Sequence, residues 1–238
     1  MNLALTEPLP LTQHDLFSLE ECDDLSERVL SLRSAWTRRG QDFYSLGTAA
    51  YLDATADRTA YLEAARRTNE TLRAGFDDTY EILCEFFEDL LGDPVELTGE
   101  LALPGFHVFE YDGSPRGGAE EVAGRAHFDL QFMSALPVDV PLTGTMSFTV
   151  TVEEPSGGAA LEVWPLRYSE VNTIAGSVQD YARATPSRRV VYAIGGVTVH
   201  DGQVLHAIGA SGDPRPRGRR ITMQGHAARI DDVWTLYW

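Results

Sequence analysis

Three side chains in this sequence could together hold one metal ion. His127 and Asp129 are separated by a single residue, and His206 lies much farther along the chain. On an extended strand successive side chains alternate between faces, so His127 and Asp129 would point the same way. A histidine from a neighbouring strand would complete a set of two imidazoles and one carboxylate. Such a set covers one face of an octahedral ion, usually Fe(II), and leaves positions open for a co-substrate and O₂.

The choice of His206 as the second imidazole depends on its setting. It lies in the apolar run 204–208, where a neutral imidazole suits metal ligation, although a hydrogen-bonded core histidine would fit the same pattern. Two histidines on other expected strands remain alternatives: His107 and His226. His200 lies at an expected turn, where solvent exposure is the simpler interpretation. For the His127 segment, the alternative is a solvent-facing polar stripe on a half-buried strand.

Arg220 and Thr222 share one face of a later expected strand. A guanidinium can bond a carboxylate through two parallel hydrogen bonds, and a neighbouring hydroxyl can add a third. We therefore expect this pair to bind the distal carboxylate of a 2-oxoacid. Arg219 belongs to the same basic cluster and is the alternative, but its side chain would point away from Thr222.

Helices are expected in the first hundred residues. Ser18 and Glu21 form a capping-box pattern, and apolar residues follow at helical spacing as far as Trp36. A second, longer helix is predicted from near Asp57 to Gly92, with an apolar and aromatic stripe that would pack against a sheet. These helices would support the rest of the domain.

From residue 101 onward, short β-forming runs are separated by Gly, Pro and Asp. The expected strands are 106–111, 126–132, 145–153, 161–164, 190–194, 197–200, 203–208, 220–228 and a last edge strand at 234–238. Asp201-Gly202 predicts a tight hairpin, because glycine readily adopts positive φ. Two segments, 112–125 and 166–189, are expected to be lid loops or plain surface loops. Strands after a helical layer predict an α+β β-sandwich or jelly roll with helices on one face.

The length, charge and residue composition exclude several classes of function. A length of 238 residues suits one domain, with 1–100 mainly helical and 101–238 forming the β core. The formal net charge of −17 argues against nucleic-acid binding and against docking on anionic membranes. All basic residues are arginine, so Schiff-base lysine chemistry is excluded. Cys22 and Cys84 form no C-x-x-C pair, and the first residues lack a signal peptide; both observations favour a reducing cytoplasm.

The order of these parts resembles the iron(II)/2-oxoglutarate-dependent dioxygenase superfamily, which is built on a double-stranded β-helix. The matching stretches are 104–109, His127-x-Asp129, 157–165, 202–206 and Arg220-x-Thr222, which together span about 101–228. The family often has Ser where this chain has Thr222. The small size and helical first half look like the small-molecule branch, which includes free-amino-acid hydroxylases and halogenases. Halogenases of that type replace the carboxylate ligand with Gly or Ala, so Asp129 disfavours chlorination.

The resemblance implies that His127, Asp129 and His206 hold Fe(II), and that 2-oxoglutarate meets Arg220 and Thr222. It further implies an O₂-dependent oxidation (hydroxylation, desaturation or cyclisation) of an amino acid or natural-product intermediate, with release of succinate and CO₂. The protein would be a monomer or homodimer. Substrate contacts, expected from position alone, are Gln131, Trp164, Arg167, Tyr168 and Asn172. Two alternatives stay open: a cupin-like metal-binding sandwich that acts as a sensor or ligand carrier, and an oxygenase that uses no 2-oxoacid.

Overall fold

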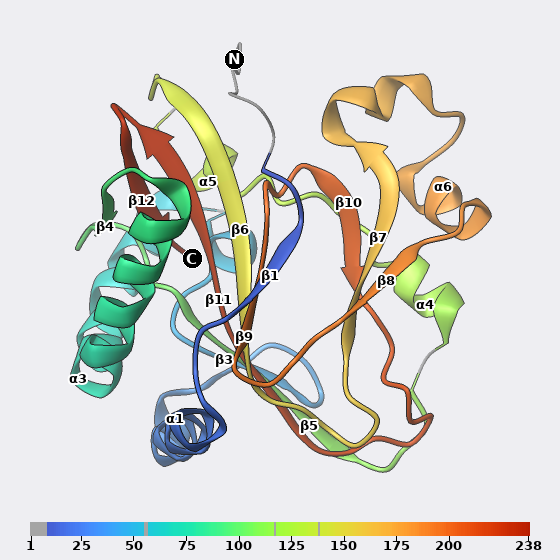
Figure 1. Cartoon of the computed structure of the whole chain (residues 1–238), viewed down its shortest axis with the longest axis horizontal. Coiled ribbons are helices and arrows are strands. Elements are labelled where there is room, and N and C mark those ends of the chain that lie inside the picture. Colours follow the sequence, from blue (N-terminus) through green and yellow to red (C-terminus); the bar gives the residue numbers. More distant parts are fainter. Residues whose placement is uncertain (1–8, 55–56, 117, 138) are drawn as a thin grey trace.

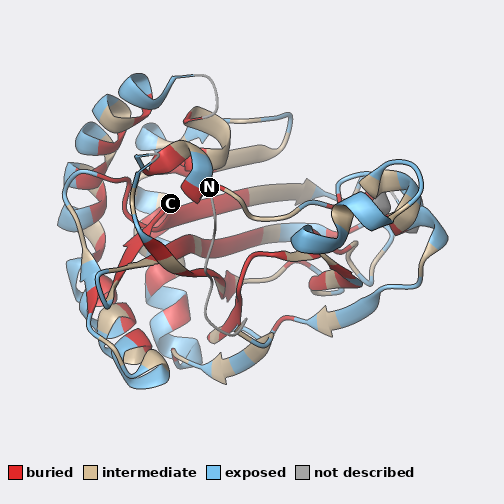
Figure 2. Ribbon diagram, turned by 90° about the horizontal axis from the view of Figure 1, so that it is seen from above, coloured by how far each residue is buried: buried red, intermediate tan, exposed pale blue. Residues whose placement is uncertain are grey.

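Two sheets form the centre of the protein, which was analysed as a computed structural model (Figure 1). The structure describes residues 9–54, 57–116, 118–137 and 139–238. Within these ranges, the chain combines helices with predominantly antiparallel strands, as the sequence pattern predicts. Figure 2 shows that buried residues are concentrated along the central strands, while the helices are buried on one side only.

The larger sheet runs through the middle of the molecule. In spatial order it contains β1 (Thr12–Asp15), β9 (Gly196–His200), β6 (Leu142–Glu153), β11 (Arg217–Ile230), β5 (Gly105–Asp112), β3 (Phe43–Leu46) and β2 (Thr37–Arg38). Near its C-terminal end β11 also pairs with β12 (Val233–Tyr237), which in turn pairs in parallel with β4 (Val95–Leu97). β6 and β11 are the long central strands, and their inward-facing side chains reach the cavity described below.

The smaller sheet faces the larger one. Its order is β10 (Val204–Ile208), β7 (Ala160–Arg167) and β8 (Arg188–Val191). A single antiparallel bridge between His127 and His206 adds one more segment beside β10. In Figure 1 this sheet lies to the right of the larger sheet, next to α4 (Ala119–Ala123) and α6 (Val178–Ala184).

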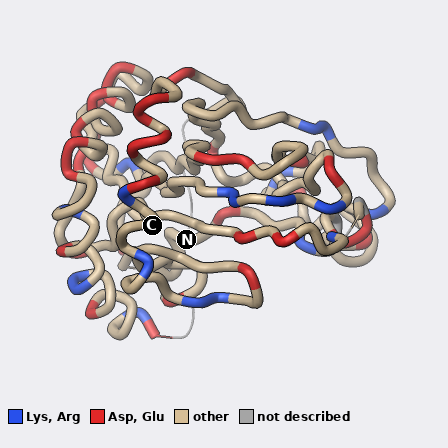
Figure 3. Tube along the Cα trace, turned by 90° about the horizontal axis from the view of Figure 1, so that it is seen from below, with Lys and Arg blue, Asp and Glu red and all other residues tan. Residues whose placement is uncertain are grey.

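The two longest helices cover the other face of the larger sheet (Figure 1). α1 (Leu19–Ser31) begins with the expected capping box between Ser18 and Glu21. α3 (Arg58–Leu91) begins after Asp57, whose carboxylate accepts two backbone N–H groups, and ends at Gly92 with a positive φ of 71°. Both sequence signals are confirmed. Acidic positions recur along these outer helices in Figure 3, consistent with a solvated outer surface.

The apolar stripe of α3 packs on the sheet as predicted. The ring of Phe76 lies 4.6 Å from that of Phe106 on β5, and Phe87 lies 4.9 Å from Phe148 on β6. All four side chains are buried. Burying side chains of this size contributes about 2 kcal/mol each, so α3 is held mainly by this contact. Within the described ranges, no helix combines the length and apolar character needed to cross a membrane.

The N-terminal part is less helical than expected, because it supplies strands β1 to β4 to the larger sheet. The expectation that the first helix continues to Trp36 is wrong. The helix ends at Ser31, and a 3₁₀ turn, η1 (Arg33–Ala35), follows. Trp36 is extended, and its ring packs 5.6 Å from that of Tyr44 on β3. Tertiary contact with the sheet therefore overrides the helical spacing here.

The strand predicted at 126–132 is also wrong. Apart from the bridge at His127, this segment leaves the sheet, and Gln131 already has helical dihedrals before α5 (Phe132–Ala135). The backbone N–H of Asp129 donates to Gly202 O at 2.7 Å, a turn contact outside the named strands. Gly202 has the expected positive φ of 77°, but it does not close a hairpin. β9 and β10 belong to different sheets, so this turn carries the chain from one sheet to the other.

The remaining differences between the predicted and observed elements concern the bounds of one strand and the structure of one loop. β8 occupies Arg188–Val191, shifted toward the N-terminus from the predicted 190–194, because a turn closed by the Gly196 N–H and Ala193 O follows it. The second of the two expected loops, 166–189, contains the short helix α6. That loop also contains the 3₁₀ helix η2 (Tyr168–Thr173), and α2 (Ala50–Asp53) precedes α3.

Candidate metal centre and adjoining cavity

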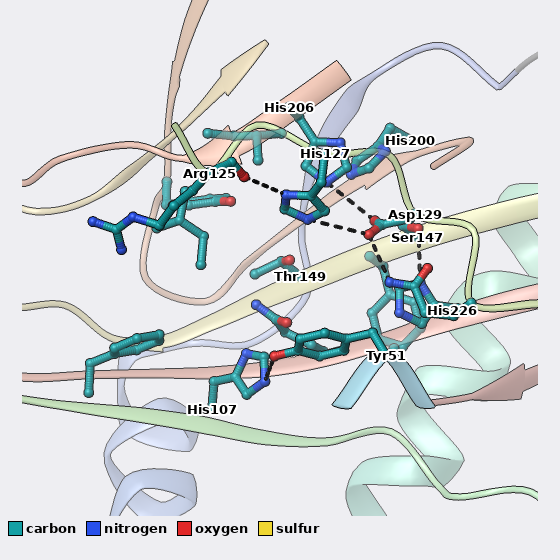
Figure 4. A pocket seen from close by; sticks show the side chains of 18 of the residues that line it. Tyr51, His107, Arg125, His127, Asp129, Ser147, Thr149, His200, His206 and His226 are labelled. Carbon is teal, nitrogen blue, oxygen red and sulfur yellow. Dashed lines mark hydrogen bonds and ion pairs between the residues drawn. The ribbon is translucent and has the colours of Figure 1, made fainter. Parts of the chain in front are cut away.

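His127, Asp129 and His206 converge at one end of the space between the two sheets (Figure 4). Each offers one ligand atom, and these atoms lie within 4.8 Å of one another. His127 Nε2 is 3.6 Å from Asp129 Oδ1, and His206 Nε2 is 3.4 Å from Asp129 Oδ2. The structure therefore brings together the three residues that the sequence analysis selected, although His127 is not on a regular strand.

The backbone sets the tautomers of the two histidines. His127 Nδ1 lies 2.9 Å from Arg125 O, and His206 Nδ1 lies 2.8 Å from Val204 O. A carbonyl oxygen only accepts hydrogen bonds, so each Nδ1 carries its proton and donates. In the neutral ring each Nε2 then keeps its lone pair, on the side that faces Asp129. Metal-binding histidines are typically oriented in this way by a second hydrogen bond.

The central carboxylate is almost fully buried, with 10% of the Asp129 side chain exposed. Burial opposes ionisation of Asp129, but the adjacent imidazoles, chiefly that of His206, hold its pKa well below the usual range. Two opposing effects also act on the pKa of His206: burial lowers it by favouring the neutral ring, and the Asp129 carboxylate raises it. An ionised carboxylate that attracts a proton to its neighbour would equally attract a divalent cation.

Gln131 orients this carboxylate. Its Nε2 donates to Asp129 Oδ1 at 3.1 Å, and its side chain is buried at the wall of the cavity. The sequence analysis placed Gln131 among the substrate contacts. In the structure Gln131 lines the cavity, but its side-chain amide donates its hydrogen bond to the Asp129 carboxylate.

A cavity of roughly 320 Å³ adjoins the three residues. Both sheets contribute to its wall, with Leu161 and Ile208 from the smaller sheet and Thr149 and Gln224 from the larger one. Tyr51 and His107 form part of the opposite wall, where the Tyr51 hydroxyl lies 2.9 Å from His107 Nε2 (Figure 4). A cavity with mixed apolar and polar walls of this size suits a small organic molecule.

Three further histidines line this cavity. The expectation that His200 is solvent-exposed is wrong: it is buried, and its ring lies 4.6 Å from that of His206. Burial lowers the pKa of both His200 and His107 to about 3, so both rings are neutral. His226 Nδ1 pairs with the hydroxyl of Ser147 at 3.0 Å. Alternation along β11 from Thr222 through Gln224 would have placed His226 on the inner face from sequence alone.

Arg220 and Thr222 are also buried on the inner face of β11. The Arg220 guanidinium lies over the rings of Phe109 and Tyr192, at 5.8 and 5.1 Å from their centroids. These two rings line the cavity, so Arg220 lies behind its wall. Its three guanidinium nitrogens form no hydrogen bond with the described residues. A buried cation without hydrogen bonds is costly, and a bound anion would satisfy it.

Arg219 points the other way, as alternation predicts. Its Nε lies 3.2 Å from Glu153 Oε2, and its side chain is 39% exposed. Glu153 also accepts a hydrogen bond from Ser26 on α1. Arg219 is therefore engaged on the outer face of the sheet and is not near the cavity.

Four of the expected substrate contacts lie away from this cavity: Trp164, Arg167, Tyr168 and Asn172. The Trp164 indole donates to Ala182 O and packs beneath α6. Arg167 pairs with Asp201, and the Tyr168 ring contacts Phe128. Proximity in the chain to a ligand-bearing strand does not determine which way a loop side chain points. Tyr51 and Gln224 line the cavity but were not predicted, because they come from elements distant in sequence from the expected ligands. His107, which the sequence offered only as an alternative metal ligand, lines the cavity as well.

Comparison with known proteins shows similarity at the level of fold. The sequence matches no protein-family model and no curated protein. Among solved structures, an N-substituted L-amino acid dioxygenase from Burkholderia ambifaria, in complex with alpha-KG (2-oxoglutarate), is similar, with a TM-score of 0.55 and 17% identity. The similarity covers 96% of this chain and 86% of that one. The non-haem alpha-ketoglutarate-dependent carbocyclase SnoK from nogalamycin biosynthesis has a TM-score of 0.52 and 12% identity, covering 92% and 81%. The chain thus shares the fold of alpha-ketoglutarate-dependent oxygenases.

Proposed function

We propose that this protein is an Fe(II)- and 2-oxoglutarate-dependent oxygenase that acts on a small molecule. The observation that carries the proposal is the convergence of His127, Asp129 and His206 beside a cavity. This is the 2-His-1-carboxylate arrangement of non-haem iron oxygenases. The fold shared with two oxygenases of this class supports the same conclusion.

The strand order supports a double-stranded β-helix as the architecture of one domain. In the larger sheet β5, β11, β6 and β9 are neighbours, and in the smaller sheet the His127 segment, β10, β7 and β8 are neighbours. Each sheet thus offers four adjacent segments, and the chain alternates between the sheets except where β8 follows β7 in the smaller sheet. The proposed metal ligands lie on the smaller sheet and the proposed carboxylate clamp on the larger one.

The donor set fits a divalent iron ion. Two imidazole Nε2 atoms with fixed tautomers and one ionised carboxylate are nitrogen and oxygen ligands of the type that Fe(II) accepts. Gln131 and the two backbone carbonyls supply the outer hydrogen bonds that orient these ligands. His127, Asp129 and His206 would hold the metal, and the opening toward the cavity would leave room for other ligands.

The buried Arg220 fits the distal carboxylate of 2-oxoglutarate. Its guanidinium has hydrogen-bonding capacity that no described residue uses, and the Thr222 hydroxyl lies on the same face of β11. When bound, iron with 2-oxoglutarate and O₂ supplies the oxidising chemistry, with succinate and CO₂ as by-products. The chain's own residues position the reactants and exclude water.

The organic substrate would occupy the cavity next to Tyr51, His107 and Gln224. These neutral hydrogen-bonding groups suit hydroxyl or carbonyl functions, and Arg125 in the same lining suits a carboxylate, as an amino acid or natural-product intermediate would present. Hydroxylation, desaturation and cyclisation are all compatible with this site.

The proposal is tested by loading the protein anaerobically with Fe(II) and 2-oxoglutarate. We expect a weak visible charge-transfer band from the anaerobic complex. On exposure to O₂ we expect release of succinate, and the substrate within a panel of metabolites should increase that release. Metal binding without the band or succinate would instead favour a cupin-like binding module. O₂ uptake with no succinate would favour an oxygenase that uses no 2-oxoacid.

A further inference from the structure

A buried carboxylate shares the environment of Arg220. Glu154 follows directly after β6, and its Oε1 lies 3.7 Å from Arg220 Nε. The two side chains are 8% and 1% exposed, so both charges are removed from solvent. Neither the carboxylate oxygens of Glu154 nor the guanidinium nitrogens of Arg220 form a hydrogen bond with the described residues.

This pair differs from two other partly buried arginine–carboxylate pairs of the protein. Arg39 and Asp53 form two hydrogen bonds of 2.7 Å, and Arg229 contacts Asp93 at 2.9 Å. A 3.7 Å separation compensates charge but is too long for a hydrogen bond. Arg220 is therefore neutralised by Glu154 while its donors stay available to another acceptor.

A dicarboxylate bound to Arg220 would change this balance. Arg220 and Glu154 together carry no net charge, so an added carboxylate would leave one uncompensated negative charge in a buried site. Two carboxylates at one buried site cannot both ionise without a large cost, and the usual outcome is that one takes up a proton. A protonated Glu154 could also donate a hydrogen bond to the bound carboxylate.

We propose that Glu154 belongs to the co-substrate site: it balances the charge of Arg220 before 2-oxoglutarate binds, and it takes up one proton when the distal carboxylate arrives. This inference rests on the proposed function. The proton comes from solvent, converts the Glu154 carboxylate to the carboxylic acid, and returns to solvent when the dicarboxylate leaves. No bond other than O–H is made or broken.

Among the ionisable groups around Glu154, only its own carboxylate can accept the proton. Arg220 faces it from β11, and burial raises the pKa of both Tyr111 on β5 and Tyr192 after β8, so these phenols stay neutral. Burial also raises the pKa of Glu154, against the opposing effect of Arg220. Glu153 and Arg219 lie on the opposite face of the sheet.

Calorimetric titration of the anaerobic Fe(II) protein with 2-oxoglutarate, in buffers of different ionisation enthalpy, tests the proposal. We expect wild type to take up about one proton when 2-oxoglutarate binds. Its affinity for 2-oxoglutarate should therefore fall as pH rises, by up to about tenfold per pH unit across the range in which Glu154 titrates. Glu154→Gln keeps the shape but cannot ionise. It should take up about one proton fewer, show no such pH dependence and bind more tightly than wild type at high pH.

Glu153→Gln is the matched control, because it removes a neighbouring carboxylate on the outer face; it should behave as wild type. If wild type binds 2-oxoglutarate in an Arg220-dependent manner with no proton uptake and a flat pH profile, the role of Glu154 is overturned while the proposed function stands. This measurement on wild type holds even if Glu154→Gln folds poorly. Absence of 2-oxoglutarate binding by wild type would overturn the proposed function itself.

Discussion

His127 and His206 exchange two backbone hydrogen bonds: His127 N donates to His206 O at 2.8 Å, and His206 N donates to His127 O at 3.0 Å. This single antiparallel pair places the two residues directly opposite each other, with ring centroids 4.5 Å apart. The next contact, from Asp129 N to Gly202 O, fixes the carboxylate beside them. Backbone pairing thus positions all three proposed ligands, even where no regular strand continues.

Replacing the central carboxylate tests the ligand set. Asp129→Ala should lower Fe(II) affinity by at least about hundredfold, more than the loss typical of an outer hydrogen bond, and should abolish substrate-dependent succinate release. Metal titration followed by fluorescence or calorimetry measures the first effect. Asp15→Ala, on the exposed edge strand β1, is the control. Retention of wild-type iron affinity by Asp129→Ala would remove Asp129 from the ligand set.

The hydrogen bond from Gln131 should matter less than the ligand that it orients. Gln131→Leu removes the 3.1 Å contact with Asp129 at similar volume. We expect Fe(II) affinity to fall by about tenfold to hundredfold with the fold intact, as judged by circular dichroism and metal titration. Gln41→Leu, in an exposed part of the chain, should leave the affinity unchanged. An effect of equal size in both variants would indicate a general loss of folding.

Arg220 and Arg219 offer a matched pair on opposite faces of β11. Arg220→Met should raise the KM for 2-oxoglutarate by about tenfold to hundredfold, because charge-assisted hydrogen bonds contribute about 1.5–3 kcal/mol. Arg219→Met should leave this KM unchanged and cost little stability, because its ion pair is partly exposed to solvent. Initial rates of succinate formation at varied 2-oxoglutarate concentration measure both. The reverse result would assign the clamp to Arg219.

The sequence could predict that His127, Asp129 and His206 lie close together because the relevant signals are local. Alternation along a strand applies to Arg220 and Thr222 on β11, and His206 lies on β10 as expected. His127 and Asp129 also come together, but through one backbone bridge and a turn and not through the predicted strand. Helix boundaries such as Asp57 and Gly92 were equally predictable, since capping side chains and positive-φ glycines act over a few residues.

The sequence could not predict which sheet each strand enters. Asp201-Gly202 has the signal of a hairpin, but the same positive φ serves a crossover between sheets, which places His200 in the cavity instead of in solvent. Likewise, nothing local shows that Tyr51 from α2 meets His107 from β5. These contacts depend on long-range packing, which periodicity does not encode.

The buried His107 should make folding sensitive to acid. Burial and the charges of Arg220 and Arg39 lower its folded-state pKa to about 3 from an ordinary value of 6.5. Between these two values the unfolded chain binds a proton that the folded protein does not, so stability falls as pH decreases from 6.5 toward 3. At pH 5 this costs about 2 kcal/mol relative to neutral pH.

Urea unfolding at pH 7 and pH 5 measures this effect. His107→Gln loses the contact with Tyr51 and should be less stable at pH 7, but its stability should change less between the two pH values, by about 2 kcal/mol. His14→Gln on β1, outside the cavity, is the histidine control. Equal pH dependence in wild type and His107→Gln would show that His107 is not the group responsible.

Gly202 links the fold to the proposed metal centre. Its φ of 77° disfavours any residue with a Cβ, and a Cβ built there would lie 2.8 Å from Ser147 Oγ and 3.1 Å from Asp129 Cβ. Since Asp129 N also donates to Gly202 O, a shift of this turn must move the carboxylate. Gly202→Ala should therefore lower stability by about 1–3 kcal/mol and weaken Fe(II) binding in the protein that remains folded. Gly92→Ala has a similar φ of 71° but an open surrounding, so it should lower stability without changing iron affinity. If Gly202→Ala bound iron as tightly as Gly92→Ala, the turn would not be what positions Asp129.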